Sequence, residues 1–388
     1  MSESPYRAKR PPDEEFTGRL RHVQEGMRDR ALDGIVGFSA YMEREGNVLY
    51  LTGHRNVFPP WASDSVRNGA GLAAVLVPQD GLVTLFSSYR GDQKSLAGTI
   101  EDVVQTLDLS GSIVEAIRRR YGSDGAKVLG IAGSDVMTVL LYRRLVDAFP
   151  DTRFVIVDDL LVSLRAEKSP YEQAALRRSA EVADAGIRAA MAAAVNGATE
   201  KEVAMAAQWA CLEAGADHVV RTRLRAGDEM LAQGRWPLAT SRPINSGEIV
   251  YMDLLGWVDN YVFDVARTWG VGPLSGELEE LIAASNGLID ATIAAIRPGV
   301  TGDEVVREAI EPFAGSKWAS RYFPMGHGVG IECVENPWIM PEATMPLKEG
   351  MVLSLEPSFV IPGVTKAQQE DMVIVTATGC EILTKAIR

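Results

Sequence analysis

The sequence predicts an α/β domain followed by an α+β domain. At roughly 100–200 residues per domain, a chain of 388 residues is expected to form about two domains. Strand-like and helix-like segments alternate up to about residue 160, whereas in the rest of the chain helices come first and strands concentrate later. A content of 46% hydrophobic and 23% charged residues is that of a globular protein, which excludes a disordered chain.

The amino-terminal domain is expected to span residues 1–163. Short apolar runs predict buried strands, and segments with an apolar residue every three or four positions predict helices. The expected strands are 34–38, 72–78, 82–88, 128–133 and 154–159, and the expected helices are 19–32, 112–121 and 135–148. Gly69–Ala74 matches the pattern of a dinucleotide-binding loop. Because a strand follows it where such a loop needs a helix, we interpret it as structural.

A strong helix start marks the beginning of the second domain, which is expected over residues 164–388. Ser169 can cap the helix, Pro170 suits its first position, and Glu172 completes a capping box. Two later pairs have the same residue types at the same spacing, Thr199 with Glu202 and Thr301 with Glu304. The domain is predicted to contain helices near 170–195, 200–214, 275–297 and 302–313, and strands at 249–255, 260–269, 351–356 and 370–376.

Charge and composition argue against several kinds of partner. A net charge of −13 disfavours nucleic acid, since binding phosphates needs a basic face. No run approaches the ~18 apolar residues of a membrane span, and the amino terminus lacks the apolar stretch of a secretory signal. The three cysteines are odd in number and far apart in sequence, so they form no disulfide framework. We expect a cytoplasmic protein that binds neither nucleic acid nor membranes.

The segment 247–269 carries the first residues that suggest chemistry. It is predicted as a β-hairpin with Asp253 and Asp264 on opposite strands. With the turn centred between Val258 and Asp259, the two aspartates are expected directly opposite each other, with Cβ atoms about 5 Å apart. Two carboxylates this close among apolar residues need a shared proton or a cation between them. The hairpin alone leaves open that one aspartate simply faces water.

Three further residues offer suitable metal ligands. His327 is flanked by glycines, which permit close approach of the backbone. Glu356 ends one predicted apolar strand and Glu370 begins another, where an isolated buried carboxylate would be costly. Four carboxylates and one imidazole suit one or two divalent cations such as Mn, Co, Fe or Zn. Two cations about 3.5–4 Å apart can share a hydroxide and polarise a carbonyl.

These motifs resemble those of the M24 metallopeptidases with the pita-bread fold, a family that includes methionine aminopeptidase, aminopeptidase P, prolidase and the non-peptidase creatinase. The matching motifs are the two hairpin aspartates with Arg267-Thr268-Trp269, Gly326–Gly330, Glu356-Pro357 and Glu370-Asp371. Residues 46–53 resemble the amino domain of creatinase and aminopeptidase P. The resemblance implies a creatinase-like α/β domain followed by an α+β pita-bread catalytic domain. It also implies five metal ligands: Asp253, Asp264, His327, Glu356 and Glu370.

The same resemblance implies a metal-dependent hydrolase that cleaves a C–N bond, amide or peptide, in a small molecule or short peptide. Water activated by two divalent ions would attack the carbonyl, with manganese the first choice and Fe, Co or Zn as alternatives. Glu356 and His327 are the expected catalytic residues, Glu356 as ligand and proton shuttle. Members of the family are commonly homodimers whose amino domain reaches the partner's active site. Trp61 is therefore a candidate lid residue.

Two positions depart from the peptidases of the family. Those peptidases carry one histidine about eleven residues before the glycine that opens the hairpin, and a second in a His-Glu-x-Pro motif. Here the two positions are Trp236 and Val334. We therefore expect a substrate other than that of a standard aminopeptidase, with Trp236 holding an apolar or cationic group. His218, Arg221 or Arg223 would meet a substrate carboxylate, although surface placement of each is the alternative.

Three other functions remain open from the sequence. The protein can be an Xaa-Pro dipeptidase or aminopeptidase that tolerates the loss of both histidines. It can be an enzyme like dimethylsulfoniopropionate lyase, which its arginines and Trp236 resemble, although Cys333 stands where that lyase is expected to carry an acidic residue. It can also be a non-catalytic binding member. Retention of all five ligands counts against this last possibility, because a protein that only binds has no need of them.

Overall fold

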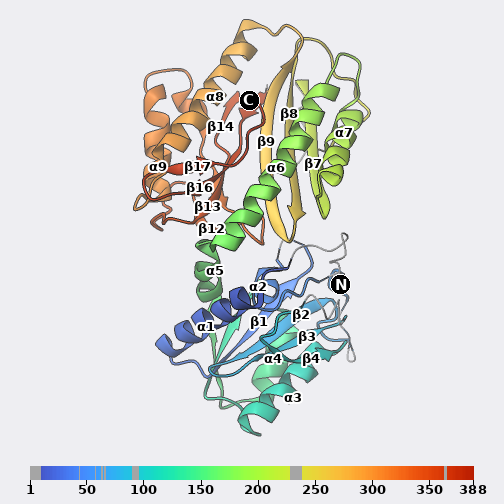
Figure 1. Ribbon diagram of the computed structural model, residues 1–388, viewed down its shortest axis with the longest axis vertical. Coiled ribbons are helices and arrows are strands. Elements are labelled where there is room, and N and C mark those ends of the chain that lie inside the picture. Colours follow the sequence, from blue (N-terminus) through green and yellow to red (C-terminus); the bar gives the residue numbers. More distant parts are fainter. Residues whose placement is uncertain are drawn as a thin grey trace. The chain divides into compact units, whose positions relative to one another are not determined.

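The computed structural model describes residues 10–42, 44–56, 58–62, 64, 67–89, 96–227, 238–361 and 365–388. The chain divides into two compact units, which we call the amino-terminal unit (Lys9–Arg165) and the carboxyl-terminal unit (Ala166–Arg388) (Figure 1). Both units combine helices with β-sheets. No helix in the described ranges is both long and apolar enough to cross a membrane.

The amino-terminal unit is built on one six-stranded sheet in the order β4-β3-β2-β1-β5-β6. The strands are β1 (Gly34–Ala40), β2 (Leu72–Pro78), β3 (Val83–Ser87), β4 (Ile100–Gln105), β5 (Val128–Ala132) and β6 (Arg153–Ile156). The helices are α1 (Asp13–Asp29), α2 (Gly46–Thr52), α3 (Leu109–Tyr121), α4 (Val139–Ala148) and α5 (Asp158–Ala166). The predicted strand over 154–159 was wrong at its end, because α5 begins at Asp158; β4 and α2 were not predicted.

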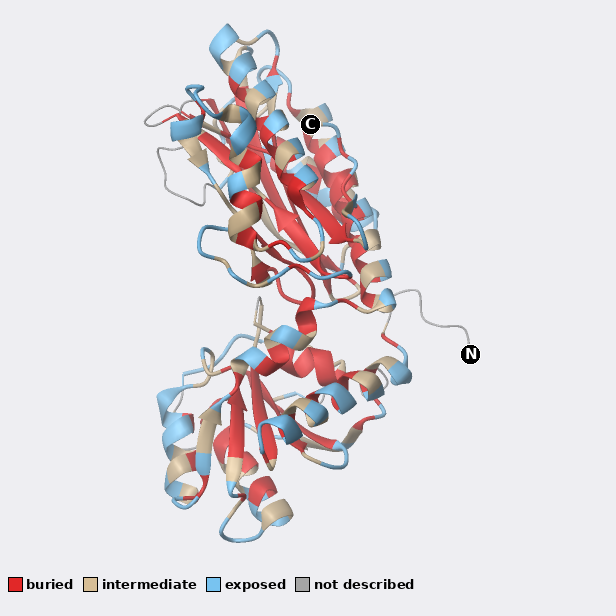
Figure 2. Cartoon of the chain, turned by 90° about the vertical axis from the view of Figure 1, so that its left-hand side faces the viewer, coloured by how far each residue is buried: buried red, intermediate tan, exposed pale blue. Residues whose placement is uncertain are grey.

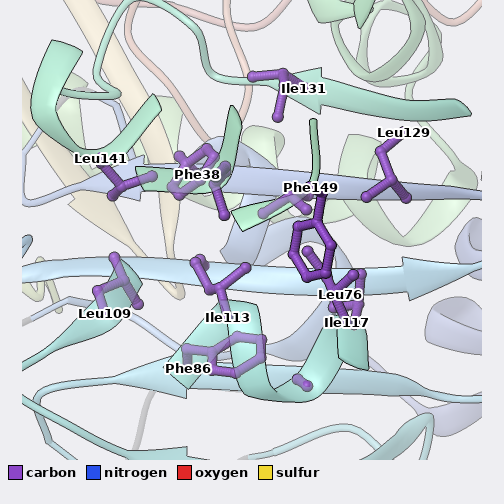
Figure 3. Packing of buried hydrophobic residues seen from close by; sticks show 14 of the residues in the cluster. Phe38, Leu76, Phe86, Leu109, Ile113, Ile117, Leu129, Ile131, Leu141 and Phe149 are labelled. Carbon is purple, nitrogen blue, oxygen red and sulfur yellow. The ribbon is translucent and has the colours of Figure 1, made fainter. Parts of the chain in front are cut away.

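An apolar core lies between one face of this sheet and helices α3 and α4 (Figure 3). Alternate residues of the central strands point into it, such as Val36 and Phe38 on β1, because side chains of a strand alternate between its two faces. Ile113 and Ile117 on α3 meet them with the four-residue spacing of one helix face. Strand residues spaced two apart and helix residues spaced three to four apart therefore pack in one core.

In the described residues of the carboxyl-terminal unit the α-helices are α6 (Pro170–Ala193), α7 (Glu200–Glu213), α8 (Gly276–Ala295) and α9 (Gly302–Ile310). All three predicted capping boxes are confirmed, at the starts of α6, α7 and α9. At the first of these, the side chain of Ser169 accepts a hydrogen bond from the backbone of Glu172, and the carboxylate of Glu172 accepts one from the backbone of Ser169. Helix α6 packs against β8 and β9, and α7 packs against β7.

Three antiparallel sheets complete this unit, in the orders β7-β8-β9, β12-β11-β13-β16-β17 and β10-β14-β15. The long strands are β7 (His218–Ala226), β8 (Glu248–Val258) and β9 (Tyr261–Val271). The shorter ones are β10 (Tyr322–Phe323), β11 (Gly326–Gly328), β12 (Glu335–Trp338), β13 (Val352–Leu355), β14 (Ser358–Ile361), β15 (Thr365–Gln368), β16 (Asp371–Val375) and β17 (Cys380–Ile382). The central strands are buried along almost their whole length (Figure 2).

The hairpin of β8 and β9 is confirmed, but its predicted register was wrong. The turn consists of Asp259 and Asn260, both with positive φ (52° and 70°), so Val258 pairs with Tyr261. Such two-residue turns match the twist of the flanking strands, and aspartate and asparagine tolerate positive φ. As a result Asp253 faces Ala266, and Asp264 faces Leu255. The two aspartates are diagonal neighbours on one face, a relation that places Cβ atoms about 7–8 Å apart at most.

Candidate metal centre

Five predicted ligands lie on or beside strands of two different sheets. Asp253 lies in β8 and Asp264 in β9, while His327 is the central residue of β11. Glu356 follows β13, and Glu370 immediately precedes β16. The two sheets are joined where the backbone N–H of Glu370 donates to the carbonyl of Ala266, the residue opposite Asp253, at 2.9 Å. Strand pairing thus brings segments together that are more than a hundred residues apart in the chain.

Three of these residues form a compact buried group. One ligand atom each of Asp264, His327 and Glu370 lies within 4.8 Å of the other two, an arrangement that can hold a metal ion. The side chain of Glu356 borders this group, since its Oε1 lies 3.6 Å from His327 Nε2. Glu356 is also less buried than the other four, with 20% of its side chain exposed.

The neighbours of this group orient its ligand atoms. His327 Nδ1 lies 3.1 Å from the carbonyl of Gly328. Because a carbonyl only accepts hydrogen bonds, Nδ1 donates this one, and Nε2 faces Glu356 and Asp264. Burial alone would lower the pKa of His327, but these two carboxylates outweigh it and raise the pKa. Ser354 Oγ donates to Glu370 Oε1 at 2.6 Å, and Cys333 Sγ donates to Asp264 Oδ2 at 3.1 Å. Within the part of the chain that the structure describes, the buried Glu370 Oε2 has no hydrogen-bond partner.

The carboxylates of this group resist ionisation. Burial, reinforced by the charge of Asp253, raises the pKa of Asp264 to about 7. Burial and the neighbouring carboxylates raise the pKa of Glu370 well above its ordinary value. A divalent cation beside them would stabilise the ionised forms, and it would supply the partner that Glu370 Oε2 lacks. The residues present therefore fit a bound metal ion.

Asp253 has a different environment, with protein cations around it. Arg223 on β7 is its cross-strand neighbour, and Arg223 Nη1 donates to Asp253 Oδ2 at 2.7 Å. Tyr251 donates to the same oxygen at 3.5 Å. The ammonium group of Lys366, on β15, lies 4.0 Å from the centre of the Tyr251 ring and interacts electrostatically with Asp253. Burial lowers the pKa of Lys366, while Asp253 and two glutamates oppose that shift.

Comparison with known proteins agrees with the fold of each unit. The model of metallopeptidase family M24 matches residues 174–377, and that of the creatinase/prolidase N-terminal domain matches residues 19–166. The chain belongs to metallopeptidase family M24. It is therefore a metal-dependent, peptidase-like hydrolase with a creatinase-like amino-terminal domain and a pita-bread catalytic domain, as the motifs predicted.

The relatives of this M24 protein include peptidases. An Xaa-Pro dipeptidase of Pyrococcus furiosus is 30% identical over 61% of this chain and 68% of its own length. An uncharacterized peptidase of Staphylococcus saprophyticus is 27% identical over 94% of this chain and 99% of its own. The prolidase structure of Pyrococcus horikoshii OT3 superposes with a TM-score of 0.80 at 23% identity, covering 96% of this chain and 99% of its own. The dipeptidase PepE of Mycobacterium ulcerans does so with a TM-score of 0.81 at 25% identity, covering 97% of each chain.

The substrate-binding residues predicted from the sequence lie in different places. Arg223 contacts Asp253, whereas His218 lies at the other end of β7 and stacks on Trp257, with ring centres 4.9 Å apart. Trp61 belongs to the amino-terminal unit and is 40% exposed. Trp236 lies outside the described residues.

Several residues beside this M24 site were missed by the sequence analysis. Lys366 and Gln368 both lie on β15, and Gln368 Nε2 donates to Glu356 Oε2 at 3.0 Å. Their spacing of two residues, continued at Glu370, was the available signal, since side chains two apart share a face of a strand. Nothing in the local sequence pointed to Ser354, because its role depends on a contact between strands. Cys333 was noted only as a departure from the lyase, and its hydrogen bond to Asp264 was not predicted.

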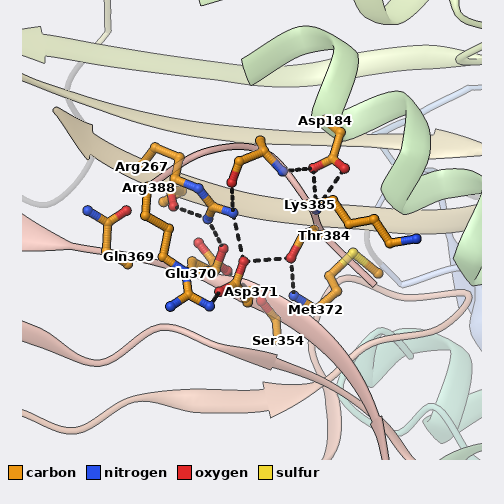
Figure 4. A network of polar contacts seen from close by, with 12 residues as sticks. Asp184, Arg267, Ser354, Gln369, Glu370, Asp371, Met372, Thr384, Lys385 and Arg388 are labelled. Carbon is orange, nitrogen blue, oxygen red and sulfur yellow. Dashed lines mark hydrogen bonds and ion pairs between the residues drawn. The ribbon is translucent and has the colours of Figure 1, made fainter. Parts of the chain in front are cut away.

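A buried polar network holds the backbone beside Glu370 (Figure 4). The guanidinium of Arg267, on β9, donates to the backbone carbonyl of Glu370 and to Asp371 Oδ1, the latter at 2.7 Å. Asp371 also accepts a hydrogen bond from Thr384 at 2.6 Å and pairs with Arg388 at 2.6 Å. Arg267, the arginine of the Arg-Thr-Trp motif, thus fixes the backbone at Glu370, one of the predicted ligands. Its guanidinium pairs with the carboxylate of Asp371.

Proposed function

We propose that this protein hydrolyses a C–N bond, amide or peptide, in a small molecule or short peptide, with divalent metal held by Asp264, His327, Glu356 and Glu370. The observation that carries the proposal is the buried Asp264–His327–Glu370 group, in which one carboxylate oxygen has no hydrogen-bond partner among the described residues. Carboxylates and imidazole suit Mn, Fe, Co and Zn, and we retain Mn as the first choice. A divalent ion bound there supplies a Lewis acid that polarises a carbonyl and makes water nucleophilic.

We assign ligand orientation and proton transfer to residues of the chain itself. His327 is oriented by the carbonyl of Gly328, and Glu370 is oriented by Ser354. Glu356 is the most accessible carboxylate of the group, and one of its oxygens is held by Gln368. The other oxygen, Oε1, lies 3.6 Å from His327 Nε2 and would take a proton from water and pass it to the leaving nitrogen. We therefore assign the proton shuttle to Glu356.

The substrate is proposed to differ from that of a standard aminopeptidase. Val334 stands where the family's peptidases have a histidine, and it is 43% exposed. Its side chain can neither hydrogen-bond a peptide nor transfer a proton. The second candidate is an Xaa-Pro dipeptidase, which is the name of the 30% identical relative. An amide or N-acyl bond of a small amino-acid derivative is the substrate class that we favour.

A substrate screen tests this choice. Protein loaded with Mn, Fe or Zn is incubated with X-Pro dipeptides, N-acylated amino acids, betaines and ectoines. Turnover of a non-peptide amide that disappears in Glu356→Gln supports the proposal. Ala-Pro or Gly-Pro turnover near the ordinary enzyme median of ~10 s⁻¹, raised further in Val334→His, would identify an Xaa-Pro dipeptidase instead. Release of an alkene without uptake of water would identify a lyase.

The homodimer and the cytoplasmic location expected from the sequence remain part of the proposal. A dimer would let the amino-terminal domain of one subunit, with Trp61, reach the site of the other. A size measurement by light scattering at micromolar concentration tests it, and a monomer at that concentration would remove the lid role of Trp61.

A further inference from the structure

The guanidinium of Arg223 contacts Asp253, a predicted metal ligand that is thereby already paired with a protein cation. Arg223 and Asp253 are directly paired across β7 and β8, and the side chains of both are about nine-tenths buried. The 2.7 Å contact is made to Asp253 Oδ2, and Tyr251 donates to that oxygen as well. A metal ion that used this oxygen would have to displace both donors. Burial makes such a displacement costly, because the buried guanidinium would lose this ion pair without gaining contact with water.

Lys366 adds a second protein cation to the same region. Its ammonium group interacts electrostatically with Asp253, Glu356 and Glu370, and it donates a hydrogen bond to Gln368 Oε1 at 3.0 Å. The side chain comes from β15, so the two cations approach the carboxylates from two different sheets.

The charges of the site match a single divalent ion. Its four carboxylates carry four negative charges when ionised, and Arg223 with Lys366 offsets two of them. One divalent ion balances the remainder, whereas two ions with a shared hydroxide would leave an excess of one positive charge in a buried site. The geometry agrees, since the compact group that can hold a metal ion contains Asp264, His327 and Glu370 but not Asp253.

We propose that Arg223, assisted by Lys366, replaces one of the two metal ions of the family's dinuclear sites, so that this protein binds one divalent ion. The inference rests on the proposed metal-dependent function and defines its cofactor. Asp253 then serves as an anchor for Arg223 rather than as a metal ligand. The guanidinium also supplies a fixed positive charge on the face of β8 that carries Asp253.

Metal stoichiometry tests the inference without relying on activity. The full-length protein is stripped of metal and titrated with Mn²⁺ alone, with bound metal measured after equilibrium dialysis. The expected result is one tightly bound ion per chain, with the electron paramagnetic resonance spectrum of an isolated Mn²⁺ ion. Arg223→Gln should bind a second ion at least about tenfold more tightly than the wild type does, and that spectrum should show two coupled ions.

A matched control and a second variant separate the outcomes. Arg242 also pairs with a carboxylate of β8, Glu248, but lies away from the ligands, so Arg242→Gln should keep one ion. Lys366→Met tests the second cation if Arg223→Gln does not fold, and it should likewise bind the second ion more tightly. Two coupled ions in the wild type would overturn the inference and leave the proposed hydrolase intact. Absence of any tight Mn²⁺ binding would overturn both.

Discussion

The two units of this protein differ in the kind of side chain that they bury beside their sheets. In the amino-terminal unit the interior between the sheet and its helices is apolar, with Phe38, Phe86 and Leu129 fully covered. In the carboxyl-terminal unit the strands carry Asp264 and Glu370 into an interior where each is at most 7% exposed. Apolar burial stabilises a fold by itself, at roughly 25 cal/mol for each Å² removed from water. Buried carboxylates destabilise it unless a cation, a proton or hydrogen bonds compensate.

The stability of the two units should therefore depend on different conditions. The amino-terminal unit should respond to changes in packing volume and remain indifferent to metal. The carboxyl-terminal unit should respond to metal and to changes of charge at the site, because its buried carboxylates need a compensating cation. The following predictions test that contrast.

The largest effect is expected for Asp264→Asn. Loss of a ligand charge should reduce activity by more than about 100-fold. The metal-free variant should nevertheless be at least as stable as metal-free wild type, since burial and the charge of Asp253 disfavour the ionised carboxylate. Activity assays and thermal unfolding of the stripped proteins measure the two effects. A stripped variant clearly less stable than stripped wild type would argue against repulsion between these carboxylates.

Truncation in the apolar core should have a large effect confined to the amino-terminal unit. Phe38→Ala removes a fully buried ring and should lower the free energy of unfolding by about 3–5 kcal/mol. Denaturant unfolding measures this loss, and metal analysis of the folded variant should show the wild-type content. A reduced metal content would contradict the independence of the two units.

Metal-free protein should show opposite pH responses in its two units. The pKa of Asp264 is about 7 in the folded protein against an ordinary value of 3.8. The stability that its protonated form contributes is therefore present below pH 3.8 and is lost as the pH rises to about 7. Burial lowers the pKa of His54 in the amino-terminal unit from 6.5 to about 4, so stability there is lost as the pH falls from 6.5 to 4. Denaturation of wild type, Asp264→Asn and His54→Gln across pH 4–8 measures both slopes. Each variant should flatten the slope of its own unit only.

The smallest effect is expected at the start of α6. Ser169→Ala removes the side-chain acceptor of a capping box and should cost about 1 kcal/mol in the free energy of unfolding. Metal content and activity should not change, because neither residue of the box touches the ligands. Ser169→Asp, which keeps an acceptor at the cap, should restore most of the loss, and failure to do so would place the effect elsewhere.

The sequence by itself determined the local elements and the chemistry of the site. The three capping boxes, the β8–β9 hairpin and the period-two strands depend on neighbours in the chain, so they could be read from residue types and spacing. The motifs around His327, Glu356 and Glu370 likewise identified the M24 family before any contact was known. Local patterns were insufficient for the hairpin register. Two residues with positive φ set the turn, so the cross-strand neighbour of Asp253 is Ala266 rather than the predicted Asp264.

Only the tertiary structure decided what surrounds the ligands. Arg223 was expected to meet a substrate from its sequence context, yet the pairing of β7 with β8 places it on Asp253. Lys366 and Ser354 join the site from two different sheets. Charge compensation in a buried site depends on distances of a few ångströms between groups far apart in the chain, and sequence spacing carries no such distances. The sequence therefore identified the predicted ligands, whereas the packing of the sheets determined which cationic side chains lie beside them.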